Sequence, residues 1–558
     1  MIVGALLVRQ MLVRGLPIIV RNSTCDDRLM IRMAEGLLGG NWLGDYNGLT
    51  LMKGSFFPMF LAAVHAAGIP YLAAVTALHS AACLFFVSQL RFLLKGRMSR
   101  FLLFLFLLFE PASFDGYTFQ AVYRNSITIP QVLLITGSLS GLWLDYGKHR
   151  WKDWIRAILA GFGIWSFWNT REDAVWILPF VLLGTLLAFG KETAAFRKSR
   201  SFRSLITGVL ICVFPFCVLL TGNERIRREN RIHYGLPVQL ECADGAFAGS
   251  LRTIYSVKNR EEIPCVTVSQ EKLLRLYEAS PALAGIRKEL DESNAFYSKA
   301  GRNRHSGEVE DGWFFWGLRQ AAYTAGKAGS LPEAENYYRQ IEQEIRNAAA
   351  AGELEMQKTM PSALMSPWRQ GYGKKMAETG VRTLSSLLFF KDAAALKQND
   401  RQLSPDILAE FEEISGERAV IPEDESSGSA KRAAAAADRM NRIGWLYQVL
   451  NPLFGILAAV LFPVSLLFSL IRKRGEHLPF FLTVAGMGFS ILVMTAGIAY
   501  TDISAFPAVR CTYLAGAYPL MVSCIWLTLL YGSHIFLRGR ILLLFHRRLR
   551  MTGGAVRR

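Results

Sequence analysis

Seven stretches of this chain are each about as long and as apolar as a helix that crosses a lipid bilayer. A transmembrane helix needs about 20 consecutive, mostly apolar residues. The strongest candidates are residues 71–94, 126–145, 173–190, 204–221, 445–470, 479–500 and 512–535, and the weaker ones are residues 1–20, 101–114 and 154–169. The sequence therefore predicts an α-helical polytopic membrane protein with about ten transmembrane helices.

The beginning of the chain is the weakest of these candidates, because Arg9 and Arg14 interrupt its apolar run. A signal peptide is the competing interpretation. No small-residue cleavage site is evident, so residues 1–20 are predicted to form a shortened first span.

The composition fits a chain that mixes membrane helices with one sizeable polar part. Of the 558 residues, 51% are hydrophobic and 19% are charged, whereas soluble domains carry about 25% charge. The mean hydropathy is +0.23, which is high for a soluble protein but low for a chain that is apolar from end to end. These values exclude a disordered chain, a collagen and a small disulfide scaffold.

The net charge of +18 is explained by the positions of the basic residues. Clusters of Lys and Arg follow every second candidate span, as expected when positive residues remain in the cytoplasm. The charge therefore indicates membrane topology and no nucleic-acid partner. It predicts that both termini are cytoplasmic and that the long segment 222–444 is extracytoplasmic. The clusters lie within residues 95–100, 148–156, 191–203, 472–474 and 538–550.

The same pattern divides the chain into four parts. These are an N-terminal membrane module (1–221) with about seven spans and a first outer loop (21–70), an extracytoplasmic domain (222–444), a three-span module (445–535) and a basic cytoplasmic tail (536–558). Apolar residues recur at helical spacing within residues 331–349, so the domain 222–444 is predicted to be mostly helical. The aromatic run 313–316 favours core packing over a sugar-stacking surface, and a Cys242–Cys265 disulfide is left open.

Two adjacent carboxylates, Asp26 and Asp27, begin the first outer loop. If a helix starts here, acidic residues in its first turn favourably complement its dipole, which is the structural alternative. As functional groups, they are candidates for a general base. Their oxygens also leave a divalent cation open as a cofactor, because such ions prefer oxygen ligands.

Three cations lie in the same set of predicted outer loops: Lys53, Arg124 and Arg171. Lys53 precedes a short apolar segment, where a lysine either extends its amine to water or binds an anion. Arg171 is followed by Glu172 and Asp173 in a tight turn, where an Arg–carboxylate pair holding the hairpin is the alternative to a functional role.

Together these groups suit the transfer of a group from a lipid phosphate, because cations neutralise a phosphate and a carboxylate deprotonates an acceptor hydroxyl. Asp502 and Arg510 bracket the last outer loop, where the case for function is weaker.

The order of these motifs resembles that of the GT-C class of membrane glycosyltransferases, nearest to the protein-O-mannosyltransferase and aminoarabinose-transferase branch. An acidic pair follows the first span, an Arg ends the loop after the third span, and a Thr-Arg-Glu turn starts at Thr170. The resemblance covers about residues 1–221 well and the last three spans loosely. The remaining motif is Lys53-Gly54-Ser55-Phe56-Phe57-Pro58-Met59-Phe60, where the family often has Lys-Pro-Pro or Lys-Gly-Pro before an aromatic-Pro step.

The resemblance implies a GT-C-like bundle in a bacterial cytoplasmic membrane, with a polyprenyl-phosphate sugar as donor and a glycan, lipid or protein as acceptor. Asp27 or Asp26 would be the catalytic carboxylate. Lys53, Arg124 and Arg171 would contact the donor phosphate, with Glu172 and Asp173 in support. The resemblance implies no firm cofactor or metal.

The chain also departs from that class, because Lys53 is followed by Gly-Ser and the large polar segment lies between the predicted seventh and eighth spans. Two other functions therefore stay open. A membrane scaffold would bind a cell-wall partner through its outer domain. A transporter of lipid or polysaccharide precursors would show internal repeats, and none is evident in the sequence.

Overall fold

The computed structural model describes residues 1–145, 150–292, 294, 296, 306–357, 362–363, 365–399, 403–421, 427–471 and 475–535. Within these ranges the chain is almost entirely helical, and extended segments meet only as isolated bridges such as that of Ile18 with Ala419. The basic segments 472–474 and 538–550, part of the cluster at 148–156 and the tail 536–558 lie outside the described residues.

The structure is that of an α-helical membrane protein. Within the described ranges, seven helices are long and apolar enough to cross a bilayer, or eight if one pair bent by 55° counts as a span. The predicted total of about ten stays a prediction. The seven are built on α4 (Tyr71–Gln89), α6 (Thr128–Leu144), α8 (Leu178–Ser199), α9 (Phe202–Tyr234), α18 (Gly428–Ile471), α19 (Leu478–Ser504) and α21 (Tyr518–Leu527).

Three shorter or more polar helices complete this bundle. The bent pair consists of α5 (Arg97–Leu108) and residues 111–120. The helix α7 (Arg150–Trp168) packs against α6 and α9. The first helix, α1 (Ile2–Val13), has only 12 residues, so at about 1.5 Å per residue it is too short to cross the bilayer.

The helix α6 lies at the centre of the bundle, since 89% of its apolar window is buried inside the protein. A helix that is apolar on all sides is stable in such a position. In contrast, only 22% of the corresponding window of α9 and 17% of that of α18 are buried. Leu186, Leu210 and Val460 are each more than half exposed, as expected for a face that meets lipid.

The predicted boundaries at 221/222 and 444/445 are wrong, because each falls inside a continuous helix. The helix α9 runs from Phe202 to Tyr234 and α18 from Gly428 to Ile471. Hydropathy marks where a helix leaves the apolar region, but the helix continues wherever its polar residues still favour helical geometry.

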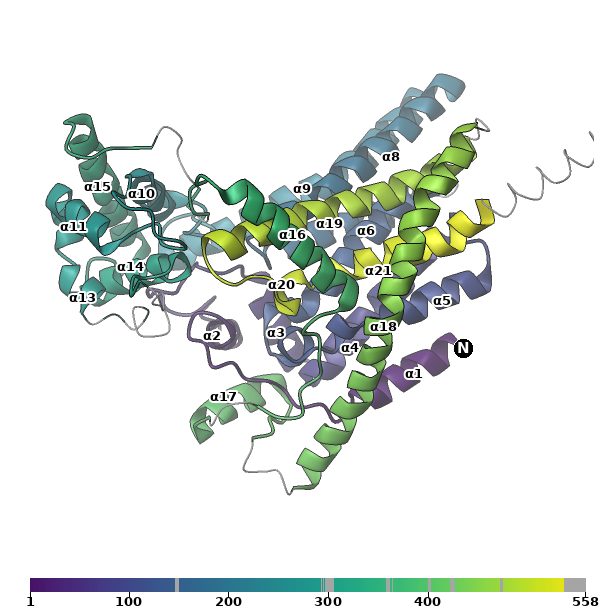
Figure 1. The fold of residues 1–558 in the computed structure, drawn as a ribbon, viewed down its shortest axis with the longest axis horizontal. Coiled ribbons are helices and arrows are strands. Elements are labelled where there is room, and N and C mark those ends of the chain that lie inside the picture. Colours follow the sequence, from purple (N-terminus) through teal and green to yellow (C-terminus); the bar gives the residue numbers. More distant parts are fainter. Residues whose placement is uncertain are drawn as a thin grey trace, which may run out of the picture.

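The segment 222–444 also divides into two structural parts. The first, which we call the insert domain (described residues of 235–357), is a helical unit with its own core. The second contains α16 (Tyr372–Phe389), which packs on α18 and α19, and α17 (Pro405–Ser415), which packs on α2 and α3. This second part therefore belongs to the membrane module. In Figure 1 the insert domain lies at one end of the bundle, opposite the N-terminus and the connection of α8 to α9.

The core of the insert domain is formed by α10 (Gly245–Ser256), α11 (Gln270–Ala279), α14 (Asp311–Thr324) and α15 (Leu331–Ala350). Phe314 and Trp316 of α14 are 1% and 5% exposed, so core packing is confirmed for these aromatic residues. Cys242 and Cys265 are both free thiols. Their sulfurs bond to the carbonyls of Met52 and Ile503, so the Cys242–Cys265 disulfide is absent.

Candidate functional site

The second helix, α2 (Asp27–Leu38), begins at the acidic pair, and the two carboxylates face different surroundings. The Asp27 carboxylate is fully buried and accepts the backbone N–H groups of Arg21, Asn22 and Ser23 at 2.7, 3.1 and 2.8 Å. Burial raises the pKa of Asp27, although these hydrogen bonds oppose the shift. Asp27 therefore ties the chain entering α2 into a compact turn, and its oxygens are already occupied.

The Asp26 carboxylate, in contrast, lies between cations. Lys53 Nζ is 3.3 Å from Asp26 Oδ1, and Arg21 is 3.7 Å from Asp26 Oδ2. The hydroxyl of Tyr123 donates to Asp26 Oδ1 at 2.9 Å. Burial alone would raise the pKa of Asp26, but Lys53, Arg21 and Arg124 outweigh it and hold the pKa well below its usual range. Asp26 is therefore an ionised carboxylate at neutral pH.

Lys53 is held in place by a close approach of two loops. A Cβ on Gly54 would lie 2.1 Å from the carbonyl oxygen of Asn169, so only glycine fits here. The next turn is fixed by the N–H of Phe56, which donates to the same carbonyl at 3.1 Å. Lys53 Nζ also lies 5.5 Å from the ring centre of Trp316 in the insert domain. The lysine is therefore buried between the bundle and the insert domain, rather than extended to water.

Arg124 and Glu172 form the next part of the same network. Arg124 NH1 donates to both Glu172 oxygens at 2.5 and 2.6 Å, and Arg124 Nε donates to the Tyr123 hydroxyl at 3.0 Å. Burial would raise the pKa of Glu172, but Arg124 and Lys53 lower it to about 2. Burial also raises the pKa of Tyr123 to about 12, so its hydroxyl keeps the proton that it shares with Asp26.

Arg171 and Asp173 form a pair within their own turn. The Arg171 guanidinium donates to both oxygens of Asp173 at 2.8 and 2.6 Å and to Asn125 Oδ1 at 2.6 Å. This is the hairpin ion pair that the sequence left as an alternative. The structure thus joins Asp26, Lys53, Arg124 and Glu172 through Tyr123. It places Arg171 and Asp173 beside them, and it turns the Asp27 carboxylate into a loop.

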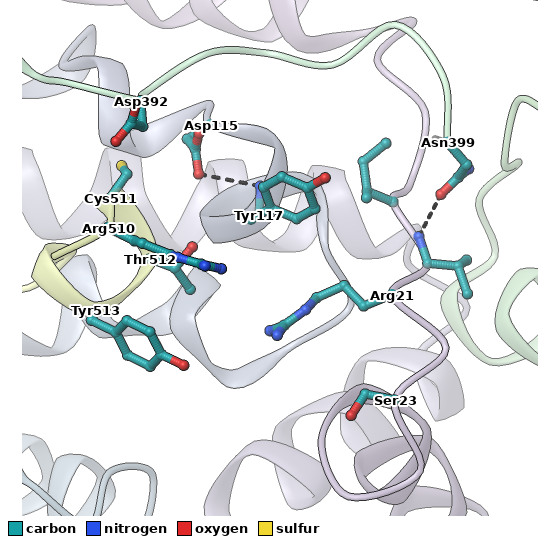
Figure 2. A pocket seen from close by; sticks show the side chains of 12 residues that line it. Arg21, Ser23, Asp115, Tyr117, Asp392, Asn399, Arg510, Cys511, Thr512 and Tyr513 are labelled. Carbon is teal, nitrogen blue, oxygen red and sulfur yellow. Dashed lines mark hydrogen bonds between the residues drawn. The ribbon is translucent and has the colours of Figure 1, made fainter. Parts of the chain in front are cut away.

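A cavity of about 690 Å³ lies directly beside Asp26. Arg21 and Ser23, which line it, both contact the Asp26 carboxylate. Arg510 lies at the start of α20 (Cys511–Leu514) on the opposite wall, and Figure 2 shows Arg21 and Arg510 extending into the same space. Tyr117 and Tyr513 supply aromatic rings to the lining.

Sequence reasoning missed the roles of Arg21 and Tyr123 and gave little weight to Arg510. Arg21 stacks on the Tyr123 ring at 5.3 Å, but neither residue belongs to a charged cluster that a sequence pattern would mark. Asp502, the other residue noted in the last loop, pairs with Arg382 and accepts the N–H groups of Ala508 and Val509. It therefore orders the loop that carries Arg510.

The arrangement offers one ionised carboxylate, several fixed cations and an adjacent cavity. Among the residues that the structure describes, no three His, Cys, Asp or Glu side chains are grouped so that they could hold a metal ion. The chemistry available to these side chains is proton transfer at Asp26 and charge stabilisation by Lys53, Arg21 and Arg510.

The Arg124–Glu172 pair predicts a specific dependence of stability on pH. The pKa of Glu172 falls from 4.5 to about 2 on folding, so the pair stabilises the fold fully above pH 4.5 and loses its effect as the pH falls towards 2. The lowered pKa corresponds to stabilisation on the order of 3 kcal/mol. In thermal unfolding, Glu172→Gln should have a lower Tm than the wild type, by a difference that is constant above about pH 5 and shrinks below it.

The matched control is Glu353→Gln, which changes an exposed carboxylate of the insert domain and should leave Tm unchanged at every pH. A difference between wild type and Glu172→Gln that keeps its size down to pH 2 would contradict the assignment.

No protein-family model, curated protein or solved structure matches this chain.

Proposed function

We propose that this protein is an integral membrane glycosyltransferase of the GT-C type. It would move a sugar from a polyprenyl-phosphate donor to an acceptor on the extracytoplasmic side of a bacterial cytoplasmic membrane. The observation that carries the proposal is the position of Asp26. Its ionised carboxylate contacts Lys53 and Arg21, and it lies directly behind the wall of a large cavity that a second arginine, Arg510, also lines.

The resemblance to the GT-C class rests on short motifs, and their positions in the fold support it. Asp26, Lys53, Arg124 and Glu172 come from three separate segments of the chain, and they form one hydrogen-bonded and ion-paired network. Unrelated charges at the ends of spans have no reason to form such a network. The spare capacity for a substrate lies with Lys53, Arg21 and Arg510, because Arg124 and Arg171 are already bidentate to carboxylates.

In the proposed reaction, an acceptor hydroxyl oxygen attacks the anomeric carbon of the sugar. Its proton passes to Asp26, the bond from the anomeric carbon to the phosphate oxygen breaks, and polyprenyl phosphate leaves with the electron pair. Arg21 and Lys53 stabilise the negative charge that develops on the phosphate. As Lys53 turns from Asp26 towards the phosphate, the pKa of Asp26 rises, which makes the carboxylate a better base at the moment when the proton moves.

The proposal is tested with the full chain in nanodiscs that contain polyprenyl-monophosphate sugars. Release of polyprenyl phosphate and gain of a hexose or pentose by an acceptor are followed by mass spectrometry. Turnover should require both a donor and a hydroxyl acceptor. If none of the mannosyl, glucosyl, galactosyl and aminoarabinosyl donors is consumed, the proposal is wrong.

Arg510 provides a test of the donor end of the cavity. Arg510→Met should raise KM for the donor by about 10- to 100-fold, because a hydrogen bond between charged groups contributes about 1.5–3 kcal/mol. The value of kcat should change much less, since Arg510 is remote from the proton transfer. Initial rates at varied donor concentration measure both quantities.

The control is Arg228→Met, which removes an exposed arginine on α9 and should leave KM unaltered. An unchanged KM in Arg510→Met would remove this residue from the donor site.

A further inference from the structure

A second cavity, of about 420 Å³, lies between α2, the first outer loop and α14 of the insert domain. It is separate in its lining from the cavity beside Arg21 and Arg510. In Figure 1, α2 lies between the helices of the bundle and those of the insert domain. We call this second cavity the α2–α14 groove.

Two helix faces lead from the Asp26–Lys53 pair into the α2–α14 groove. Asp26 immediately precedes α2, and Leu29 and Met33, which line the groove, follow it at intervals of three and four residues. Residues at this spacing share one face of a helix. The α2 wall therefore begins at the carboxylate that we propose as the base.

The opposite wall has the same relation to Lys53. The ring of Trp316 lies under Lys53 Nζ, and Gln320 and Tyr323 follow at helical spacing and line the groove. Because Lys53 Nζ is 3.3 Å from Asp26, the two walls start from one point. The groove extends about 10 Å along α2, at about 1.5 Å per residue, which suits a short chain of units better than a single small molecule.

The chemistry of the lining favours a carbohydrate. Leu29 and Met33 form a buried apolar floor, and the Tyr323 ring is 36% exposed beside it. Arg32, Asp45 and Gln320 add polar side chains to the same lining. Apolar and aromatic surfaces accept the C–H faces of sugar rings, and polar side chains bond to their hydroxyls.

An extended peptide fits this groove less well. A peptide is held mainly by free backbone N–H and C=O groups along an open edge. Here the carbonyl of Gly44 accepts the Tyr234 hydroxyl at 2.8 Å, and the carbonyl of Gly48 accepts Arg319 Nε at 3.1 Å. With these carbonyls occupied, recognition depends on side chains.

We infer that the α2–α14 groove binds an oligosaccharide acceptor and presents its terminal hydroxyl to Asp26. Calling the bound glycan an acceptor rests on the proposed transferase function, whereas its binding in the groove does not. Sugar donor and glycan acceptor would then approach the same carboxylate from different sides, the donor through the cavity at Arg21 and the acceptor along α2.

The inference is tested by direct binding to the full chain in nanodiscs, without donor. Saturation-transfer NMR and calorimetry would use mono- to tetrasaccharides of three neutral series, namely β-1,4-linked N-acetylglucosamine, α-1,4-linked glucose and α-1,2-linked mannose. The tripeptide Ala-Ser-Ala serves as the peptide probe. In at least one series the affinity should rise with length beyond the monosaccharide, and Tyr323→Ala and Gln320→Ala should each weaken binding about tenfold, which corresponds to about 1.4 kcal/mol.

The matched control for Gln320→Ala is Gln340→Ala. Both glutamines bond through Nε2 to the residue four positions later on their helix, but only Gln320 lines the groove. Gln340→Ala should bind as the wild type does. Absence of binding in all three series, binding of the tripeptide alone, or binding unaffected by both groove variants would overturn the inference. Sugar transfer measured separately would then still report on the proposed function.

Discussion

Replacement of Asp26 by asparagine is expected to reduce sugar transfer by a factor of about 10² to 10⁴, the usual contribution of a positioned general base. Asparagine keeps an oxygen that accepts the Tyr123 hydroxyl, but it cannot take a proton from the acceptor. The loss should therefore appear in kcat, with little change in KM for the donor. The measurement is the initial rate of polyprenyl phosphate release by the variant in nanodiscs.

Asp27→Asn is the informative companion, because it changes the neighbouring carboxylate in the same way. Asp27 accepts three backbone N–H groups, and an amide has only one oxygen to offer them. Asp27→Asn should therefore lower Tm markedly, by a free energy of unfolding on the order of 3 kcal/mol, whereas Asp26→Asn should remain folded with a Tm nearer that of the wild type. Equal transfer rates for Asp26→Asn and wild type would exclude Asp26 as the base.

Arg319→Met is expected to destabilise the insert domain by about 3–5 kcal/mol, the usual cost of leaving one member of a buried ion pair without its partner. Arg319 and Glu241 are 2% and 0% exposed, and they form a bidentate pair. Arg319 also donates to the carbonyls of Gly48 and Thr50 at 3.1 and 3.0 Å. Its loss should lower Tm and increase hydrogen exchange in residues 46–51.

The control for Arg319→Met is Arg339→Met in the same domain. Arg339 pairs with Glu335 at 3.5 Å, but its side chain is 62% exposed, and pairs of this kind contribute about 0–1 kcal/mol. The double variant Arg319→Met with Glu241→Leu should recover part of the loss, because it removes both buried charges. If Arg319→Met and Arg339→Met had the same small effect, the buried pair would not hold the loop to α14.

The membrane part of the fold was accessible from the sequence because length and apolarity are local properties. Helices such as α6 and α19 correspond to single uninterrupted apolar runs. The ends of α9 and α18 were not accessible in this way. In α9 the polar continuation includes Arg225 and Glu229, an i,i+4 pair that supports a helix but carries no hydropathy signal.

The candidate site was predictable in its charged members and not in its geometry. Asp26, Lys53, Arg124 and Glu172 stood out because charges at the ends of apolar runs need an explanation. The sequence could not separate Asp26 from Asp27, since the difference depends on how residues 21–23 turn their N–H groups inward. It also could not reveal that Arg510, far away in the chain, faces the same cavity as Arg21.

The continuity of α9 determines how the insert domain is mounted on the membrane. One helix of 33 residues, about 50 Å long at 1.5 Å per residue, carries Asn230 and Tyr234 to the loop that forms one side of the α2–α14 groove. The domain is therefore fixed to a rigid rod with 3.6 residues per turn, in which each added or deleted residue rotates everything beyond it by about 100°. Changes in the length of α9 are tolerable only in steps close to whole turns, so its helical phase, rather than any flexible linker, sets how the groove is aimed at Asp26.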